Sequence, residues 1–135
     1  MHVPLKKLVA ALNAEFAFYK GLDGSKNGLQ VKGKPTVGNV AVACDAALET
    51  IKKAADAKAD LLIVHHGLFW KHQDPRTVRV TFERVDAAQK ASLSIYAMHL
   101  PLDAHPVLGN NAVLARMLGI KNPKPCVKEE GAFIA

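Results

Sequence analysis

Hydrophobic residues are spaced along the chain in two alternating ways, one typical of helices and one typical of strands. Between Leu5 and Phe16 they recur every three or four positions, which predicts an amphipathic helix. Val40 to Asp45 forms a short valine-rich run instead, which predicts a strand. By these criteria the expected helices cover 5–16, 46–59, 78–91 and 112–118, and the expected strands cover 40–45, 61–64 and 93–98.

This alternation of strands and helices predicts an α/β fold, with residues 1–135 in a single domain. Strands joined through helices pair in parallel by right-handed crossovers, so we expect a layered sandwich with a mainly parallel sheet flanked by helices. The strands are almost continuously apolar, which indicates a sheet covered on both faces. The order of the strands cannot be read from the pattern.

Polar residues and glycines indicate where the helices begin and end. Asp45 is the expected N-cap of the helix over 46–59, and Asn110 or Asn111 that of the last helix, which Gly119 ends.

Two stretches between these elements are expected to be loops, residues 21–28 and the segment that follows Val64 through Pro75. Asn27, Gly28 and Gln30 have too few neighbouring glycines for a phosphate-binding loop, so they predict a tight turn.

Composition narrows the class of protein. Half of the residues are hydrophobic and 22% are charged, which is typical of a globular chain. No apolar run approaches the ~20 residues of a membrane helix, and the N-terminus lacks the apolar core of a signal peptide, so the cytoplasm is the expected location.

Two cysteines do not make a disulfide framework. Cys44 lies in an apolar run and is expected to be buried, whereas Cys126 receives no role.

The formal net charge of +6 allows two interpretations. A basic excess attracts anionic partners such as a nucleotide or nucleic acid. The lysines are spread along the chain, however, which favours a solvated surface without a specific partner.

Candidate metal ligands follow the predicted strands. The second strand is followed by His65 and His66, and the third by His99 and then Asp103. The carboxyl ends of parallel strands share one edge of a sheet, where ligands bind, so we expect these side chains to converge there. Neutral imidazole suits zinc, iron, nickel or copper, and a carboxylate adds an oxygen ligand. Gly67 is expected to give the chain the freedom to turn after the histidine pair.

Each of these residues also has a simpler interpretation. The histidine pair could be two half-exposed loop residues, and Asp103, surrounded by prolines, a turn or cap residue. His99 and His105 are divided between supporting a ligand, contacting a substrate and packing. Asp45 is better explained as a helix cap than as a ligand. His72 is interpreted as a loop residue and His2 as a terminal one.

Three segments resemble one known family in the right order. VHHGLFW at 64–70, MHLPLDAHPVLGNN at 98–111 and NGLQV at 27–31 are similar to the YbgI-like proteins, also described as GTP cyclohydrolase 1 type 2 homologues or domain of unknown function 34. The resemblance implies a dinuclear metal site, with divalent ions such as zinc or iron, and a ring-shaped hexamer. Carried over by motif, the metal ligands are His65, His66 and Asp103.

The chain departs from the family pattern at its end. Family members are longer, and a histidine and a glutamate near their C-terminus complete the metal pair, whereas no histidine follows His105 here. The chain therefore resembles either the N-terminal half of a family member, which its abrupt apolar end favours, or a short form with an incomplete site. Alone it is expected to hold at most one metal ion weakly. Two function classes stay open: a metal-dependent hydrolase acting on a nucleotide-like or other small anionic substrate, or a non-enzymatic metal-binding ring protein that stores or delivers metal or interacts with nucleic acid or protein.

Overall fold

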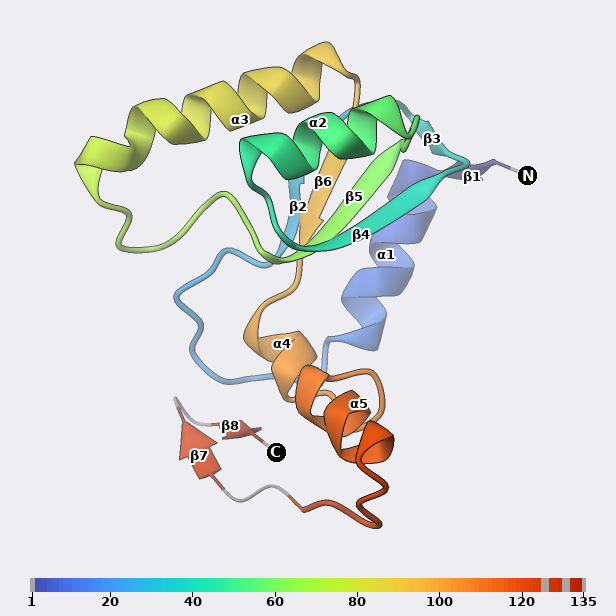
Figure 1. The fold of residues 1–135 in the computed structure, drawn as a ribbon, viewed down its shortest axis with the longest axis vertical. Coiled ribbons are helices and arrows are strands. Elements are labelled where there is room, and N and C mark those ends of the chain that lie inside the picture. Colours follow the sequence, from blue (N-terminus) through green and yellow to red (C-terminus); the bar gives the residue numbers. More distant parts are fainter. Residues whose placement is uncertain (1, 125–126, 130–131, 135) are drawn as a thin grey trace.

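A computed structural model describes residues 2–124, 127–129 and 132–134 (Figure 1). Its elements follow in the order β1 (Val3–Pro4), α1 (Leu5–Glu15), β2 (Gly28–Val31), β3 (Thr36–Val37), β4 (Val40–Asp45), α2 (Leu48–Asp56), β5 (Leu61–His66), the 3-10 turn η1 (Pro75–Thr77), α3 (Val78–Lys90), β6 (Ser94–Ala97), α4 (Leu100–Asp103), α5 (Asn110–Met117), β7 (Val127–Glu129) and β8 (Ala132–Ile134). Cys126 lies outside the described residues. Among the described helices none is long and apolar enough to span a membrane.

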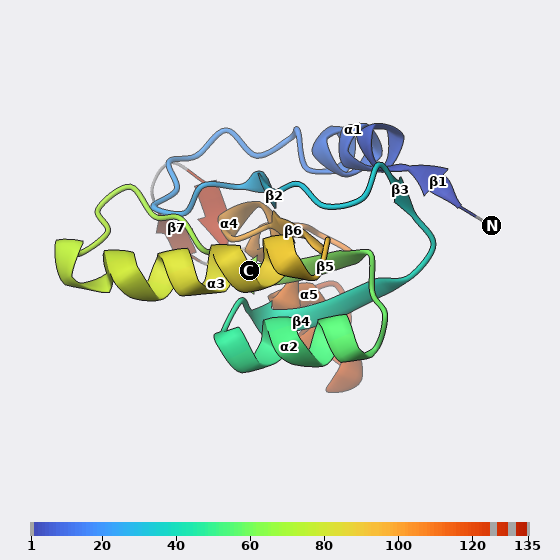
Figure 2. The same cartoon turned by 90° about the horizontal axis from the view of Figure 1, so that it is seen from above.

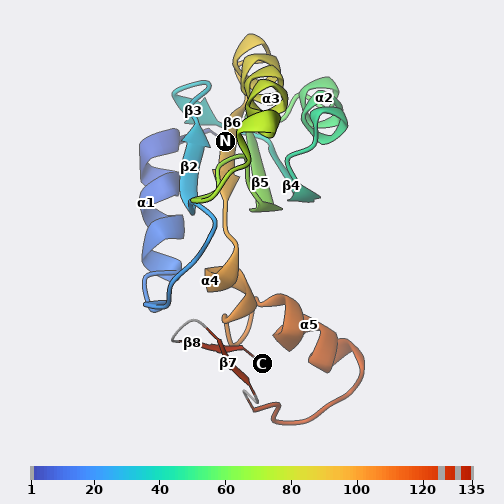
Figure 3. The same ribbon diagram turned by 90° about the vertical axis from the view of Figure 1, so that its left-hand side faces the viewer.

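The central sheet has four strands in the order β2-β6-β5-β4. β4, β5 and β6 pair in parallel, and β2 joins β6 as an antiparallel strand. Helix α2 connects β4 to β5, and α3 connects β5 to β6. Both helices cover one face of the sheet, while α1 lies on the opposite face (Figures 2 and 3). The predicted mainly parallel sheet flanked by helices is confirmed.

The core is divided by the sheet into two clusters. Alternate residues of a strand point to opposite faces. Leu62 and Val64 therefore pack under α2 and α3, whereas Leu61 and Ile63 pack against α1. Tyr96 of β6 is almost fully buried on the α1 face, and its hydroxyl donates to Asn13 Oδ1 at 2.8 Å. Burial raises the pKa of Tyr96 to about 12, which keeps this hydroxyl protonated and able to donate.

Two expectations about strands are wrong. The segment from Gly28 to Val31 is strand β2 and not a turn, because its backbone pairs with β6. The sheet is also not covered on both faces along β4, which is an edge strand. Val42 is 77% exposed, and Cys44, predicted to be buried, is exposed as well. The apolar pattern of β4 did not reveal that α1 covers only the neighbouring strands.

The predicted helix caps also need correction. Helix α2 begins at Leu48 with Ala47 as N-cap residue, and Asp45 lies two residues earlier, where its Oδ1 accepts from the Ala47 N–H at 3.0 Å. The N-cap of α5 is Gly109, and Asn110 is already helical. Gly119 ends α5 as expected, since its φ of 73° lies in the left-handed region.

Asp60 joins the turns at the start of β4 and β5. Its buried carboxylate accepts from Lys34 Nζ at 2.8 Å and from the backbone N–H groups of Gly38 and Asn39 at 2.9 and 3.1 Å. Its backbone carbonyl accepts from Ser94 N–H at 3.0 Å. The hydrogen bonds from Lys34, Gly38 and Asn39 hold the pKa of Asp60 well below its usual value, against the opposing effect of burial.

We predict that Asp60→Asn lowers the free energy of unfolding by roughly 2 kcal/mol at neutral pH, because charge-assisted hydrogen bonds are lost. A carboxyl whose pKa is lowered by folding stabilises the protein above its unfolded pKa of about 3.9, and this contribution is lost as the pH falls toward the folded pKa. The difference between wild type and variant, measured by urea unfolding, should therefore shrink below about pH 4. Asp56→Asn, at the exposed end of α2, is the control and should change little. A difference that stays constant with pH would contradict the prediction.

Candidate metal centre

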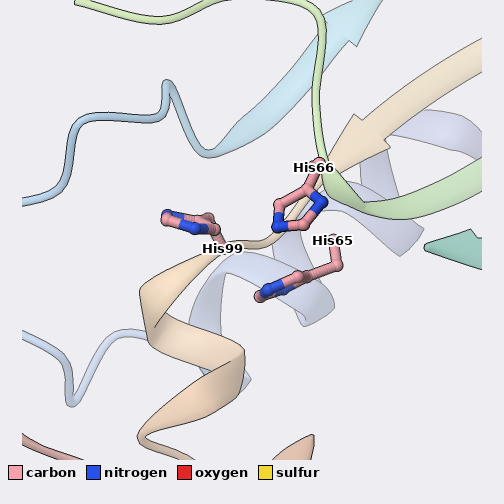
Figure 4. Close-up of side chains that lie close together, drawn as sticks. All are labelled: His65, His66 and His99. Atoms are coloured by element: carbon pink, nitrogen blue, oxygen red, sulfur yellow. The ribbon is translucent and has the colours of Figure 1, made fainter. Parts of the chain in front are cut away.

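Three histidines meet where β5 and β6 end. His65 and His66 are the last residues of β5, and His99 follows β6 and precedes α4 (Figure 4). One potential ligand atom from each lies within 4.8 Å of those of the other two. Val64 pairs with Ala97 in the parallel β5–β6 register, so the histidines that follow these residues are neighbours in space. The structure thus brings His65, His66 and His99 together, as their positions after the predicted strands led us to expect.

His65 is oriented by a backbone carbonyl. Its Nδ1 lies 3.0 Å from the Met98 carbonyl oxygen, and because a carbonyl can only accept, Nδ1 must carry the proton. In the neutral imidazole the lone pair is then on Nε2. It lies 3.5 Å from Asp103 Oδ2, and both side chains are mostly buried. Asp103 Oδ1 accepts from Asn110 Nδ2 at 2.8 Å, which fixes the carboxylate beside His65.

His99 is oriented by Asp23, a residue that the sequence did not single out. His99 Nδ1 lies 2.8 Å from Asp23 Oδ1, which leaves Nε2 as the other ring nitrogen for a ligand. A carboxylate or carbonyl behind an imidazole is the usual support of metal-binding histidines, since it fixes the tautomer and the ring orientation. Because 76 residues separate Asp23 from His99, no local sequence pattern could predict that the two side chains pair.

Asp23 also holds the turn between β6 and α4. Besides His99, its carboxylate accepts from the N–H groups of Ser25 and Leu100 and from the side-chain amide of Asn27. Asn27 in turn accepts from His99 N–H at 2.6 Å. Burial alone would raise the pKa of Asp23, but the hydrogen bonds from Asn27, His99 and Ser25 hold its pKa below the usual value. Asp23 is therefore ionised at neutral pH, and both of its oxygens can accept from the surrounding N–H groups.

His66 is the most exposed of the three histidines. Its ring centroid lies 4.5 Å from that of His65 and 5.5 Å from that of His99. Desolvation lowers the pKa of His66, and the neighbouring His65 and His99 lower it further, against the opposing effect of Asp103 and Asp45. A lowered pKa favours the neutral imidazole, which is the form that binds metal.

Gly67 is required for close packing and not for a special turn. Its φ is not positive, in contrast to that of Gly28. A Cβ at Gly67 would lie 2.4 Å from the Gln30 amide nitrogen and 2.6 Å from Ala97 Cβ. Gln30 Oε1 also accepts from Leu68 N–H at 2.6 Å, so β2 fixes the loop that follows the histidine pair.

The remaining candidate residues have structural roles or lie apart. His105 is buried between Phe16 and Phe18, and its Nδ1 accepts from the N–H groups of Val107 and Leu108. Its Nε2 therefore carries the proton toward Glu15. Of the alternatives for His105, packing is the one that the structure shows. His72 and His2 are exposed, and Asp45 is engaged with the start of α2.

A family model for Duf34/NIF3 (NGG1p interacting factor 3) matches residues 3–133. The chain belongs to this family. The relatives of this Duf34/NIF3 chain include a Deinococcus radiodurans protein named GTP cyclohydrolase 1 type 2 homolog, which is 46% identical over 106 residues covering 76% of this chain and 39% of the relative. The resemblance to YbgI-like proteins and GTP cyclohydrolase 1 type 2 homologues is confirmed.

Solved structures of relatives share the fold. The crystal structure of TTHA1606 from Thermus thermophilus has a TM-score of 0.83 and 41% identity, covering 97% of this chain and 53% of that one. The structure of protein ybgI, described as of unknown function, has a TM-score of 0.79 and 38% identity, covering 87% and 47%. The Duf34/NIF3 chain therefore spans about half or less of the length of its relatives.

The Asp23–His99 pair predicts an unusual histidine tautomer. In the metal-free Duf34/NIF3 chain at mildly alkaline pH, imidazole ¹⁵N NMR should show His99 protonated at Nδ1, because Asp23 accepts that proton. Asp23→Asn removes the carboxylate and should shift His99 toward the Nε2–H form.

Glu15→Gln is the matched control, since Glu15 is the carboxylate partner of His105 and not of His99. It should leave the His99 signals in place. If a folded Asp23→Asn protein keeps the His99 signals of the wild type, Asp23 does not set the tautomer.

Proposed function

We propose that this chain binds a divalent metal ion through the histidine cluster and Asp103. We further propose that the protein is a metal-dependent hydrolase that acts on a small anionic, nucleotide-like substrate. The observation that carries the proposal is the convergence of His65, His66 and His99 at one sheet edge, with Asp103 beside His65. The family membership and the names of the relatives support it.

The donor atoms fit a divalent transition metal. His65 and His99 each have the Nδ1 proton engaged behind the ring, so Nε2 can face an ion without a change of tautomer. His66 favours the neutral form, and Asp103 offers an oxygen. Imidazoles with one carboxylate suit zinc or iron(II) better than magnesium or calcium, which prefer oxygen ligands.

For hydrolysis, each part of the site has a role. A bound divalent ion lowers the pKa of water from 15.7 to about 7 and so supplies hydroxide at neutral pH. The chain orients the donors: Met98 holds the His65 proton at Nδ1, Asp23 holds the His99 proton at Nδ1, and Asn110 fixes Asp103. The net charge of +6 attracts anions to the surface as a whole, which permits an anionic substrate without selecting one. The ring-shaped hexamer, the second metal ion and the cytoplasmic location stay predictions.

We predict that the purified chain binds about one Zn²⁺ or Fe²⁺ ion, since the three imidazoles lie close enough to share one ion, whereas Asp103 beside His65 is too small an addition to hold a second. With the three imidazoles as ligands, one position of a tetrahedral shell stays open for water. Isothermal titration and elemental analysis give the affinity and stoichiometry. His66→Ala should weaken binding by more than about 100-fold, because the loss of a direct ligand exceeds the 10- to 100-fold cost of losing a supporting residue.

His2→Ala is the matched control, because His2 is exposed and is no member of the cluster. It should bind metal as the wild type does. Equal affinities of the wild type and His66→Ala would remove His66 from the ligand set, and two tightly bound ions per chain would mean that the set is larger than proposed.

We also predict metal-dependent turnover of at least one member of a panel of nucleotides and small phosphate esters. Activity should disappear with a chelator, return when Zn²⁺ or Fe²⁺ is added back, and be absent in His66→Ala but present in His2→Ala. Tight metal binding without turnover of any panel member would contradict the hydrolase and favour the non-enzymatic metal-binding alternative.

A further inference from the structure

A pocket of about 490 Å³ adjoins the histidine cluster. The loop after β5 and one face of α3 line it, and its lining includes Gly67, Trp70, His72, Thr81 and Arg84. Gly67 directly follows the histidine pair, so the pocket and the candidate metal centre share the end of β5. The volume lies in the range of sites for small molecules, which is about 300–1,000 Å³.

Arg84 provides this pocket with a cation whose Nε is buried and lacks a hydrogen-bond partner among the described residues. The other arginines of this segment are paired, Arg76 with Asp74 and Arg79 with Glu83. A buried donor without an acceptor is costly, and a guanidinium fork matches the two oxygens of a carboxylate or phosphate. Asp74 also lines the pocket, but its charge is compensated by Arg76.

Trp70 supplies an aromatic surface between the pocket and the histidines. Its indole lines the pocket, and its ring centroid lies 5.0 Å from that of His99 and 6.1 Å from that of His66. Its Nε1 donates to the Gly67 carbonyl at 3.2 Å, which fixes the ring. A rigid indole binds planar rings by stacking at a low entropic cost.

We infer that this pocket binds a planar aromatic molecule that carries a carboxylate or phosphate, with Arg84 contacting the oxyanion and Trp70 contacting the ring. The inference deepens the proposed function, on which it rests for the role of the pocket, because it assigns the substrate class and its binding residues. A molecule held in this way lies against the indole that the histidine cluster also contacts. Arg84 and Trp70 therefore select the substrate, and the histidines hold the metal.

The chain contains a single tryptophan, so Trp70 fluorescence reports directly on this pocket. In metal-free protein, phenyl phosphate and benzoate should both change the emission at saturating concentration, and neutral benzyl alcohol should bind at least about tenfold more weakly because it cannot contact Arg84 as an anion. The relative affinities of phenyl phosphate and benzoate show which oxyanion is preferred.

Arg84→Gln should weaken phenyl phosphate at least about tenfold and leave benzyl alcohol unchanged. Arg79→Gln is the matched control, since Arg79 lies on the same helix, is exposed and is paired with Glu83. Circular dichroism confirms the fold, and if Arg84→Gln does not fold, Arg84→Lys replaces it, because lysine keeps the charge but loses the fork. Wild-type affinity in the folded Arg84 variant, or an equal loss in Arg79→Gln, would overturn the inference.

Zn²⁺ titration of the same proteins separates this inference from the proposed function. Arg84→Gln should bind Zn²⁺ like the wild type. Phenyl phosphate binding in a protein that binds no Zn²⁺ would leave the pocket assignment intact and refute the metal site. Zn²⁺ binding without any phenyl phosphate or benzoate binding would refute the pocket alone.

Discussion

The parallel pairing of β5 with β6 places the rest of the site. Leu61 pairs with Ser94 and Val64 with Ala97, so the two strands end together and the residues that follow them lie side by side. The Met98 N–H donates to the Val64 carbonyl at 2.9 Å, which extends this pairing beyond β6. A shift of one residue would turn every side chain of β5 to the other face and separate the histidines from His99. The buried Leu61, Leu62 and Val64 oppose such a shift, because it would move each of them out of the core cluster that it fills.

A buried anion completes this arrangement. Asp23 reaches across from the segment before β2 and accepts four hydrogen bonds from the β6–α4 turn and from its own loop. It orients His99 and fixes the backbone at Leu100 at the same time. Positioning of the imidazole and stability of the turn are therefore coupled, and the antiparallel strand β2 and the loop before it serve the site by bringing Asp23, Asn27 and Gln30 to it.

The two polar regions of this edge differ in character. The histidine cluster offers neutral nitrogen donors and one carboxylate, which suits a cation. The neighbouring pocket offers a guanidinium whose Nε has no partner among the described residues, which suits an anion. Trp70 lines the pocket and packs against His99, so its indole connects the two regions.

The sequence by itself determined the strands β4, β5 and β6, the helices between them and the histidine pair at a strand end, because apolar periodicity and local order along the chain encode these features. Only the tertiary structure decided that Gly28–Val31 is a strand, that Cys44 is exposed and that His105 packs between two phenylalanines. The same holds for Asp23. Its role depends on a contact between segments far apart in the chain, and a pattern read along the sequence contains the residues of such a contact but not their pairing.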